Sequence, residues 1–286
     1  PHRHPVGAVR AKGGHDMSET QTRRVLVTGS SRGIGRALAL GLAQDGYELV
    51  VHCASNRAKA KETRKLIEEK GGKAAVVTGD LTDPCTAERL MDEAGPLDAL
   101  VLDASLQIRR PWQKISLEEY QKQMTCNFYS SLRLIQLAVP HMKAQKWGRI
   151  VTIGSVQERK PHPDMLVYSA SKAAQTNMAQ SLAQQLAADG ITVNNVAPGV
   201  IFTDRNVEAL SDPTYAAEVT ASIPAGFYGG LRWCGAAASE RRGPLHHRPI
   251  YLCGWGKEPV IRTRPVLPFP PGLPWQKRLA LPQAPA

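Results

Sequence analysis

The chain has 286 residues, 42% of them hydrophobic, which is enough for one large α/β domain. No apolar run approaches the roughly 18 residues of a membrane-spanning helix, and the N-terminus lacks the apolar stretch of a secretory signal. The five cysteines match neither a zinc-binding spacing nor a disulfide framework, so the composition predicts no metal site and a reduced, cytoplasmic setting.

The net charge of +11 is concentrated at the two ends of the chain. Residues 229–286 hold nine Lys/Arg and two Glu, and residues 1–16 hold three Lys/Arg and one Asp, which leaves +2 for residues 17–228. No basic helix interleaved with aromatic residues is visible, so nucleic-acid binding is not expected. Binding of nucleic acid through the basic tail is the alternative, and it predicts a salt-sensitive interaction that deletion of residues 229–286 removes.

The predicted elements begin after residues 1–23, which we interpret as a disordered N-terminal extension. Short apolar runs predict strands at Val25–Thr28, Glu48–His52, Lys73–Thr78, Leu97–Leu102, Gly148–Ile153 and Thr192–Val196. Helices are predicted at Gly33–Asp45, Arg57–Lys70, Pro84–Ala94, Glu118–Ala144 (as one long helix or two) and Tyr168–Ala188. This alternation predicts one α/β domain with a doubly wound parallel sheet, whose ligands lie at the carboxyl ends of the strands.

The alternation stops at about Gly229. Residues 229–286 hold ten of the 21 prolines and three of the five tryptophans. We therefore predict that the folded domain covers residues 24–228 and that an atypical, disordered Pro/Arg-rich tail follows it.

A glycine-rich segment, Thr28–Gly35, lies between the first predicted strand and the first helix. Its glycines allow a tight turn and a close approach of the backbone to a pyrophosphate, and the helix N-terminus supplies unpaired N–H groups. An ordinary structural turn is the alternative reading of such a segment. The candidate phosphate-binding residues are Gly29, Ser31, Arg32, Gly33, Ile34 and Gly35.

The segment after the second strand, residues 52–57, contains no acidic residue to bond a ribose 2′-hydroxyl. Arg32 and Arg57 can instead pair with a 2′-phosphate, which favours NADP(H) and leaves NAD(H) as the alternative, unless both arginines are merely solvated. Asp80 can bind the adenine amino group or cap a helix. Further candidate cofactor contacts are Ser55, Asn56 and Leu81.

Tyr168 and Lys172 are four residues apart in a predicted helix, so their side chains share one face. A free phenol has a pKa near ~10, and an adjacent ammonium favours the phenolate. The pair can therefore exchange a proton with a carbonyl or alcohol oxygen while hydride moves to or from nicotinamide. Ser155, after the fifth strand, can hold the reacting oxygen, and Asn127 can anchor a water leading to Lys172. Each has an ordinary structural alternative, so the assignment depends on their joint occurrence.

Together these segments resemble the short-chain dehydrogenase/reductase superfamily over residues 24–228. The matching pieces are TGSSRGIG, the DLTD after the third strand, Asn127, Ser155, YSASK, and Pro198-Gly199 with Thr203. The resemblance implies a Rossmann-like fold, a catalytic tetrad on Asn127, Ser155, Tyr168 and Lys172, and a homotetramer. It also implies nicotinamide contacts from Pro198, Gly199, Val200 and Thr203, and a substrate lid at residues 204–225. The acyl-carrier-protein reductase and glucose dehydrogenase branches look most similar.

One departure from the family's pattern follows the fourth predicted strand. The family usually has Asn-Asn-Ala-Gly there, whereas this chain has Leu-Asp-Ala-Ser at residues 102–105. Asp103 replaces an amide with a carboxylate beside the expected cofactor site, where Ala104 and Ser105 are further candidate contacts.

A second departure is the end of the chain, where the family's final helix and strand are not visible. Leu245–Pro249 can be encoded so that a reading frame one base later gives the family's Tyr-Ile-Thr-Gly. We interpret this as a frameshift near Gly229, which would expose an apolar sheet edge and impair the homo-oligomer. The sequence therefore predicts an NADP(H)-preferring oxidoreductase for a small-molecule carbonyl or secondary alcohol, with Tyr168 as general acid/base. The alternative is a cofactor-binding protein with little or no turnover.

Overall fold

The computed structural model describes residues 22–201, 203 and 211–222 of the chain. Residues 1–21 of the predicted N-terminal extension, the Pro/Arg-rich tail, and residues 204–210 and 223–225 of the predicted lid lie outside these residues. Residues 22 and 23 of the extension and residues 211–222 of the lid are described. The described part contains one six-stranded parallel sheet with the strand order β3-β2-β1-β4-β5-β6. Its strands are β1 (Arg24–Thr28), β2 (Glu48–Cys53), β3 (Ala74–Thr78), β4 (Ala99–Leu102), β5 (Gly148–Ile153) and β6 (Ile191–Val196).

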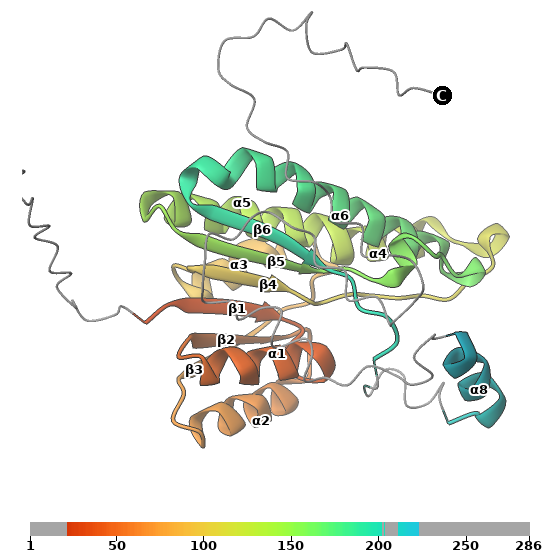
Figure 1. Cartoon of the computed structure of the whole chain (residues 1–286), viewed down its shortest axis with the longest axis horizontal. Coiled ribbons are helices and arrows are strands. Elements are labelled where there is room, and N and C mark those ends of the chain that lie inside the picture. The colour runs from red at the N-terminus through yellow and green to blue at the C-terminus, as the bar shows by residue number, and fades with distance from the viewer. Residues whose placement is uncertain (1–21, 202, 204–210, 223–286) are drawn as a thin grey trace, which may run out of the picture.

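Helices follow the strands in the chain and lie on both sides of the sheet (Figure 1). The described helices are α1 (Gly33–Gln44), α2 (Arg57–Glu68), α3 (Thr86–Ala94), α4 (Leu117–Met124), α5 (Ser130–Ala144), α6 (Leu166–Leu186) and α8 (Pro213–Ser222). Except for α8, which lies within the predicted lid and was not predicted as a helix, these bounds agree with the predicted elements to within a few residues. The predicted Rossmann-like, doubly wound α/β fold is confirmed.

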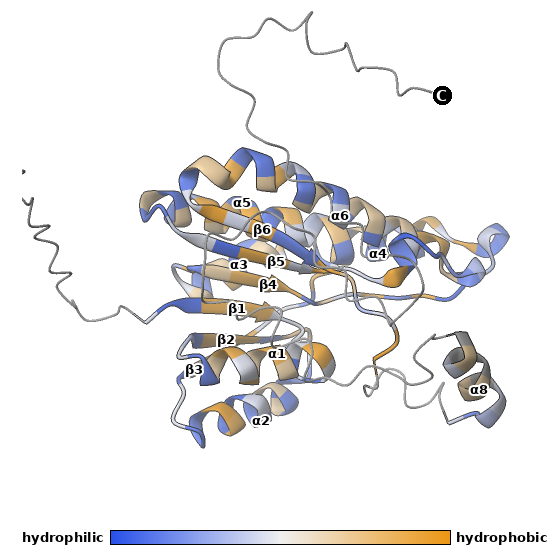
Figure 2. Ribbon diagram, viewed as in Figure 1, coloured by the Kyte–Doolittle hydropathy of each residue, from blue (hydrophilic) through white to orange (hydrophobic). Residues whose placement is uncertain are grey.

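Both faces of the sheet are buried, because successive strand residues point to opposite sides. In β1, Val25 and Val27 pack with Leu38 and Leu42 of α1 on one side. Leu26, between them, belongs to the other core, which α3, α5 and α6 cover. Figure 2 shows the matching apolar colouring along the strands. This double cover explains why the central strands are almost continuously apolar in the sequence.

The predicted helix at residues 118–144 is divided into α4 and α5 by a π-helical turn, Thr125–Tyr129. A capping box in which Ser116 and Glu119 bond each other's backbone N–H fixes the beginning of α4. The π turn carries two buried residues, Cys126 and Asn127, toward the interior. Such turns often occur at functional sites, and this one adjoins the cleft described below.

The amino-terminal ends of the strands are held by charged and aromatic side chains. The guanidinium groups of Arg23 and Arg149 each lie over the Trp147 ring, 4.4 Å from the ring centroid. Asp98 accepts the backbone N–H of Arg24 at 2.7 Å and pairs with Arg23 at 3.3 Å. These contacts join β1, β4 and β5 at the edge opposite the carboxyl ends of the strands.

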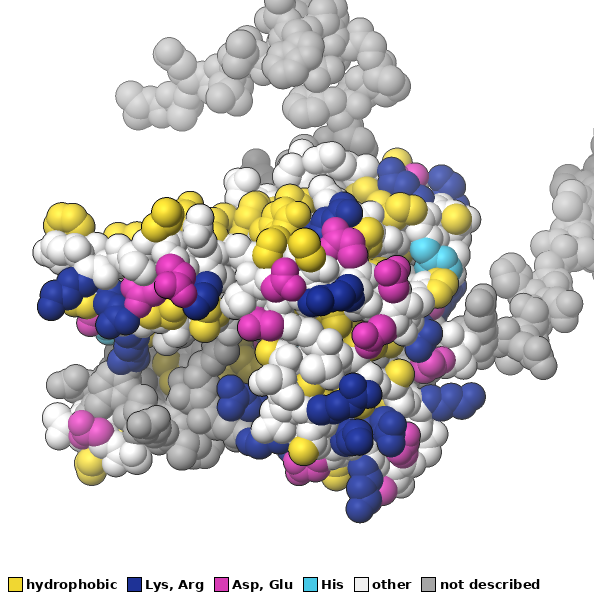
Figure 3. Space-filling view, turned by 180° about the vertical axis from the view of Figure 1, so that it is seen from behind, with side chains coloured by type: hydrophobic (Ala, Val, Ile, Leu, Met, Phe, Trp, Pro, Cys, Tyr) yellow, Lys and Arg dark blue, Asp and Glu magenta, His cyan; other side chains and the backbone are white. Residues whose placement is uncertain are grey.

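Large apolar side chains are exposed near the helices that cover one face. Leu117, Tyr129 and Leu166 are 70%, 41% and 51% exposed, respectively, and lie in or between α4 and α6. From behind, hydrophobic side chains gather along the upper edge of the molecule (Figure 3). No helix within the described residues is both long enough and apolar enough to span a membrane.

Candidate active site

A cleft of about 370 Å³ opens at the carboxyl ends of the strands. This is the position expected for ligands of a doubly wound sheet, because the chain leaves β1 and β4 toward opposite faces there. All the sequence-predicted site residues line this cleft except Gly35, Ser55, Asn56, Arg57 and Asn127.

The glycine-rich loop forms one wall of the cleft, and its glycines are required by the backbone. Gly29 and Gly33 have φ values of +69° and +58°, which side-chain-bearing residues rarely adopt. A Cβ on Gly35 would lie 2.6 Å from the Gly29 carbonyl oxygen, so this residue permits the close packing of loop and helix without touching the cleft. The α1 N-cap residue, Arg32, makes no side-chain capping bond, and the first turn of α1 holds no acidic residue. These features fit a pyrophosphate on the loop.

His52, near the end of β2, bonds the backbone of the glycine-rich loop. The sequence analysis did not predict a role for this residue. Its Nδ1 accepts the Gly29 backbone N–H at 3.0 Å, and its Nε2 lies 2.9 Å from the Gly79 carbonyl oxygen. These partners require the neutral ring with the proton on Nε2. Burial lowers the pKa of His52 from its ordinary value of 6.5, while the Gly79 carbonyl and Asp80 oppose this effect.

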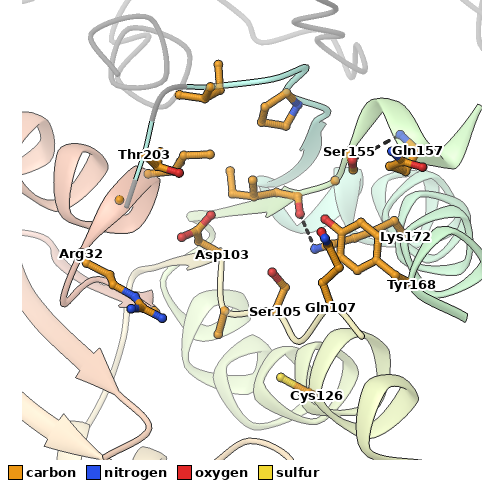
Figure 4. A pocket seen from close by; sticks show the side chains of 18 of the residues that line it. Arg32, Asp103, Ser105, Gln107, Cys126, Ser155, Gln157, Tyr168, Lys172 and Thr203 are labelled. Carbon is orange, nitrogen blue, oxygen red and sulfur yellow. Dashed lines mark hydrogen bonds between the residues drawn. The ribbon is translucent and has the colours of Figure 1, made fainter. Parts of the chain in front are cut away.

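Asp103 lies beside the same loop, in line with its expected position near the cofactor. Its backbone N–H and that of Ala104 both donate to the Thr28 hydroxyl at 3.0 Å, which ties the end of β4 to β1. A Cβ built on Gly35 would come within 2.8 Å of the Asp103 carboxylate. Figure 4 shows Asp103 between Arg32 and the Tyr168 side of the cleft. A negative charge therefore lies close to the loop that would hold a pyrophosphate.

The two arginines considered for the 2′-phosphate differ in their relation to the cleft. Arg32 lines it, whereas Arg57, the first residue of α2, is exposed and does not. Asn56 is the α2 N-cap, and its side chain accepts the Lys59 backbone N–H at 3.1 Å. Cys53, the last residue of β2, and Ala54, which follows it, line the cleft instead of Ser55 and Asn56.

Asp80 also lines the cleft, but it does not cap α3. Its side chain accepts the Thr82 backbone N–H at 2.9 Å within a local turn. The cap-like role belongs to Asp83, which accepts the Cys85 backbone N–H and the Thr86 hydroxyl. The helix-cap alternative for Asp80 was therefore wrong, and its position in the cleft is consistent with the adenine alternative.

Tyr168, Lys172 and Ser155 lie together on the opposite side of the cleft from Arg32 (Figure 4). The Lys172 Nζ is 5.9 Å from the centroid of the Tyr168 ring and donates to the Ile153 carbonyl oxygen at 2.7 Å. The Ser155 Oγ accepts the Gln157 backbone N–H at 3.2 Å, so its proton can be donated to an oxygen in the cleft. All three side chains are at least nine-tenths buried in the described structure.

Asn127 does not line the cleft, and its side chain contacts the segment after β4. Its Oδ1 accepts the Leu106 backbone N–H at 2.7 Å, and its Nδ2 donates to the Leu106 carbonyl and to Ser171 Oγ, both at 2.9 Å. The Asn127 amide therefore fixes the segment after β4 at Leu106. It also joins this segment to α6 at Ser171, next to Lys172. The predicted water contact of Asn127 stays a prediction.

Further cleft residues were not predicted from the sequence. Most of them belong to the segments after β4 and β5: Gln107, Arg109, Gly154, Val156, Gln157, His162 and Met165. The Gln157 Oε1 accepts the His162 backbone N–H at 2.6 Å and the Ser169 hydroxyl at 3.3 Å. The only available signal was position, since segments that follow parallel strands meet at the carboxyl edge of the sheet.

Comparison with known proteins agrees with this geometry. A family model described as short chain dehydrogenase matches residues 23–214. The 3beta-hydroxysteroid dehydrogenase 1 of Eggerthella lenta is 34% identical over 222 residues, which are 76% of this chain and 85% of that protein.

Solved structures show the same likeness. A 3-oxoacyl (acyl-carrier-protein) reductase from Agrobacterium tumefaciens with NADP bound has a TM-score of 0.76 and 34% identity, covering 81% of this chain and 93% of the other. A gluconate 5-dehydrogenase from Burkholderia cenocepacia in complex with NADP and tartrate has a TM-score of 0.70 and 30% identity, covering 76% and 86%. With the glycine-rich loop at one end of the cleft and Tyr168 and Lys172 at the other, this chain belongs to the short-chain dehydrogenase family and is an NAD(P)-dependent short-chain dehydrogenase/reductase.

Proposed function

We propose that this protein is an NADP(H)-preferring carbonyl reductase or alcohol dehydrogenase in which Tyr168 acts as general acid/base. The observation that carries the proposal is the arrangement of one cleft. The glycine-rich loop and Arg32 lie on one side, and Tyr168, Lys172 and Ser155 lie on the other. A dinucleotide that spans this cleft with its pyrophosphate on the loop extends toward Tyr168.

Ser155, Tyr168 and Lys172 would each have a separate role in proton transfer. When bound, the nicotinamide supplies hydride to a carbonyl carbon, or accepts hydride from an alcohol. Ser155 donates a hydrogen bond to the reacting oxygen and orients it. Tyr168 gives its phenolic proton to that oxygen during reduction and takes the proton back during oxidation. The Lys172 ammonium beside the ring favours the phenolate that remains after reduction.

The preference for NADP(H) is supported by charge at the other end of the cleft. Arg32 lines the cleft there, and no acidic residue occurs among the β2-end residues that line it, which are His52, Cys53 and Ala54. A guanidinium can pair with a 2′-phosphate, and a carboxylate that would repel this phosphate is missing from this part of the described structure. The two solved relatives named above carry bound NADP.

Replacement of Tyr168 by Phe tests the proposal. The Tyr168→Phe protein should bind NADPH with unchanged affinity but lose about 100-fold or more in turnover, because a positioned acid or base contributes roughly that much. The Tyr120→Phe protein is the matched control, since Tyr120 is 46% exposed and does not line the cleft. Substrates should be a panel of ketones, acyl thioesters and sugar acids with both cofactors, because the named relatives span these chemistries.

The same measurement decides between catalysis and binding alone. Binding of NADPH with no oxidation or reduction of any substrate in the panel would favour a cofactor-binding protein without turnover. Equal turnover by the wild type and the Tyr168→Phe protein would contradict the assigned role of the phenol.

We also propose that copies of this chain associate, as the family resemblance implies. The exposed apolar side chains at Leu117, Tyr129 and Leu166 support this proposal, because an apolar surface is commonly covered in an oligomer. Light scattering after size-exclusion chromatography tests it. A single monomer peak would contradict association. A single tetramer peak would support association and contradict the expectation that the altered end of the chain impairs assembly.

A further inference from the structure

A buried amide lies one turn beyond Lys172 in α6. Gln175 is three residues after Lys172, which places the two side chains on the same face of the helix. It is 0% exposed and does not line the cleft, so it touches neither substrate nor solvent. A primary amide at a fully buried position is costly unless its donors and acceptor are bonded.

The polar atoms of Gln175 are bonded to the reactive region. Its Oε1 accepts a hydrogen bond from the Lys172 Nζ at 3.2 Å. Its Nε2 donates to the Ser131 Oγ at 2.9 Å, and the Ser131 hydroxyl in turn donates to the Asn127 carbonyl oxygen at 3.4 Å. Ser131 is 3% exposed, so this chain of bonds runs through the interior from the π turn to the Lys172 ammonium.

A lysine side chain has several rotatable bonds, and one acceptor alone does not fix its ammonium. The Ile153 carbonyl oxygen accepts from Nζ at 2.7 Å on the β5 side. Gln175 provides a second acceptor on the α6 side. The two acceptors belong to different elements, so together they define where the ammonium lies relative to the Tyr168 ring.

We propose that Gln175 is a positioning residue that holds the Lys172 ammonium beside Tyr168, with Ser131 fixing the orientation of the Gln175 amide. The inference rests on the proposed function, since it matters for turnover only if Lys172 supports the Tyr168 phenolate. It adds a third member to the reactive pair, one that acts through Lys172 without contacting the substrate.

The test compares Gln175→Met, Gln175→Glu and Ser131→Ala with the wild type. Methionine has a similar length and suits a buried position but offers Nζ no carbonyl acceptor. We expect Gln175→Met to lower kcat for alcohol oxidation about tenfold, with KM for the cofactor and substrate changed less than about threefold. The pH at which oxidation reaches half of its plateau should rise, because a displaced ammonium favours the phenolate less.

Rescue separates this role from simple packing. Glutamate keeps an oxygen acceptor opposite Nζ, so Gln175→Glu should hold the ammonium in place and retain more kcat at the high-pH plateau than Gln175→Met. Its added negative charge also disfavours the phenolate, so at this position the pH of half-plateau is compared only between the wild type and Gln175→Met. Ser131→Ala should shift the pH profile in the same direction but less, and the two effects should not add in the double variant. Gln184→Met, an exposed glutamine of the same helix, is the matched control.

The outcomes are distinct. If Tyr168→Phe is inactive but Gln175→Met keeps the wild-type kcat and pH profile, the positioning role is overturned and the proposed function stands. If Tyr168→Phe itself keeps wild-type turnover, both are overturned. A pH shift in Gln175→Met together with a loss of plateau kcat that Gln175→Glu restores supports the proposal, as does an NADPH affinity that none of these variants changes.

Discussion

The Nδ1 atom of His52 accepts the backbone N–H of Gly29 at 3.0 Å, which links the end of β2 to the glycine-rich loop. A protonated ring would carry N–H groups on both nitrogens and could not accept this bond. Because burial lowers the His52 pKa below its ordinary value of 6.5, the folded protein resists protonation that the unfolded chain accepts. The contribution of His52 to stability is therefore complete above pH 6.5 and declines as the pH falls below it.

We expect the free energy of unfolding to decrease below pH 6.5 with a slope contribution from His52 of at most about 1.4 kcal/mol per pH unit. Urea unfolding at pH 7.5, 6.0 and 5.0 measures it. His52→Asn offers an amide oxygen to Gly29 but does not titrate, so its stability should fall less steeply with pH. The same slope in both proteins would show that His52 does not carry this dependence.

Gly35→Ala should weaken NADPH binding about tenfold or more, because its Cβ would lie 2.6 Å from the Gly29 carbonyl oxygen and the loop must shift. Titration of NADPH fluorescence measures the dissociation constant. Gly71→Ala is the control: its φ of +79° makes alanine cost about 1 kcal/mol of stability, but it is remote from the cleft. If both variants lose NADPH affinity equally, the loss arises from a less stable fold and not from the shape of the loop.

Asp103→Asn should tighten NADPH binding by about threefold to tenfold, since it removes a negative charge beside the loop expected to hold a pyrophosphate. The gain should shrink in high salt. Asp92→Asn, an exposed position on α3, removes the same charge elsewhere and should leave the affinity unchanged. Weaker binding by Asp103→Asn would mean that the carboxylate helps to hold the cofactor.

Arg32 and Arg57 were both candidates for the 2′-phosphate, but only Arg32 lines the cleft. Arg32→Ala should lower the ratio of kcat/KM for NADPH to that for NADH about tenfold or more. Arg57→Ala should change this ratio less than about twofold. Steady-state kinetics with both cofactors measures the ratio, and the reverse ranking of the two variants would assign the phosphate to Arg57.

Asn127→Ala should lower the free energy of unfolding by about 2–4 kcal/mol, because it leaves the Leu106 N–H and carbonyl groups and Ser171 Oγ without this partner in a buried region. Urea unfolding measures the change. Asn177→Ala, an exposed residue of α6, is the control and should cost less than about 0.5 kcal/mol. A negligible loss for Asn127→Ala would indicate that water replaces the amide.

The fold was readable from the sequence because its signals are local. Apolar runs such as Val25–Thr28 mark strands buried on both faces, and the glycine positions fix one turn of the backbone. Contacts between segments distant in sequence were not readable. His52 and Gly29 are 23 residues apart, and Gln175 and Ser131 are 44 apart, so no short motif contains either pair.

The sequence also could not show which of two similar residues makes a given contact. Asp80 and Asp83 both precede α3, and only the geometry shows that Asp83 bonds the first turn of the helix. Arg57 looked equivalent to Arg32 because the sequence does not show where a helix begins relative to a cleft. The reactive group at Tyr168 and Lys172 was found because both residues lie in one helix.

The contacts of Arg23 and Arg149 with the Trp147 ring lie at the opposite edge of the sheet from the cleft. Contacts that stabilise the fold and the residues that line the cleft thus lie at different ends of the same strands. Stability can therefore be changed by substitutions that do not touch the cleft. Substitutions around Trp147 offer a way to raise or lower the free energy of unfolding. Gln157 and His162 line the cleft at the other end of these strands.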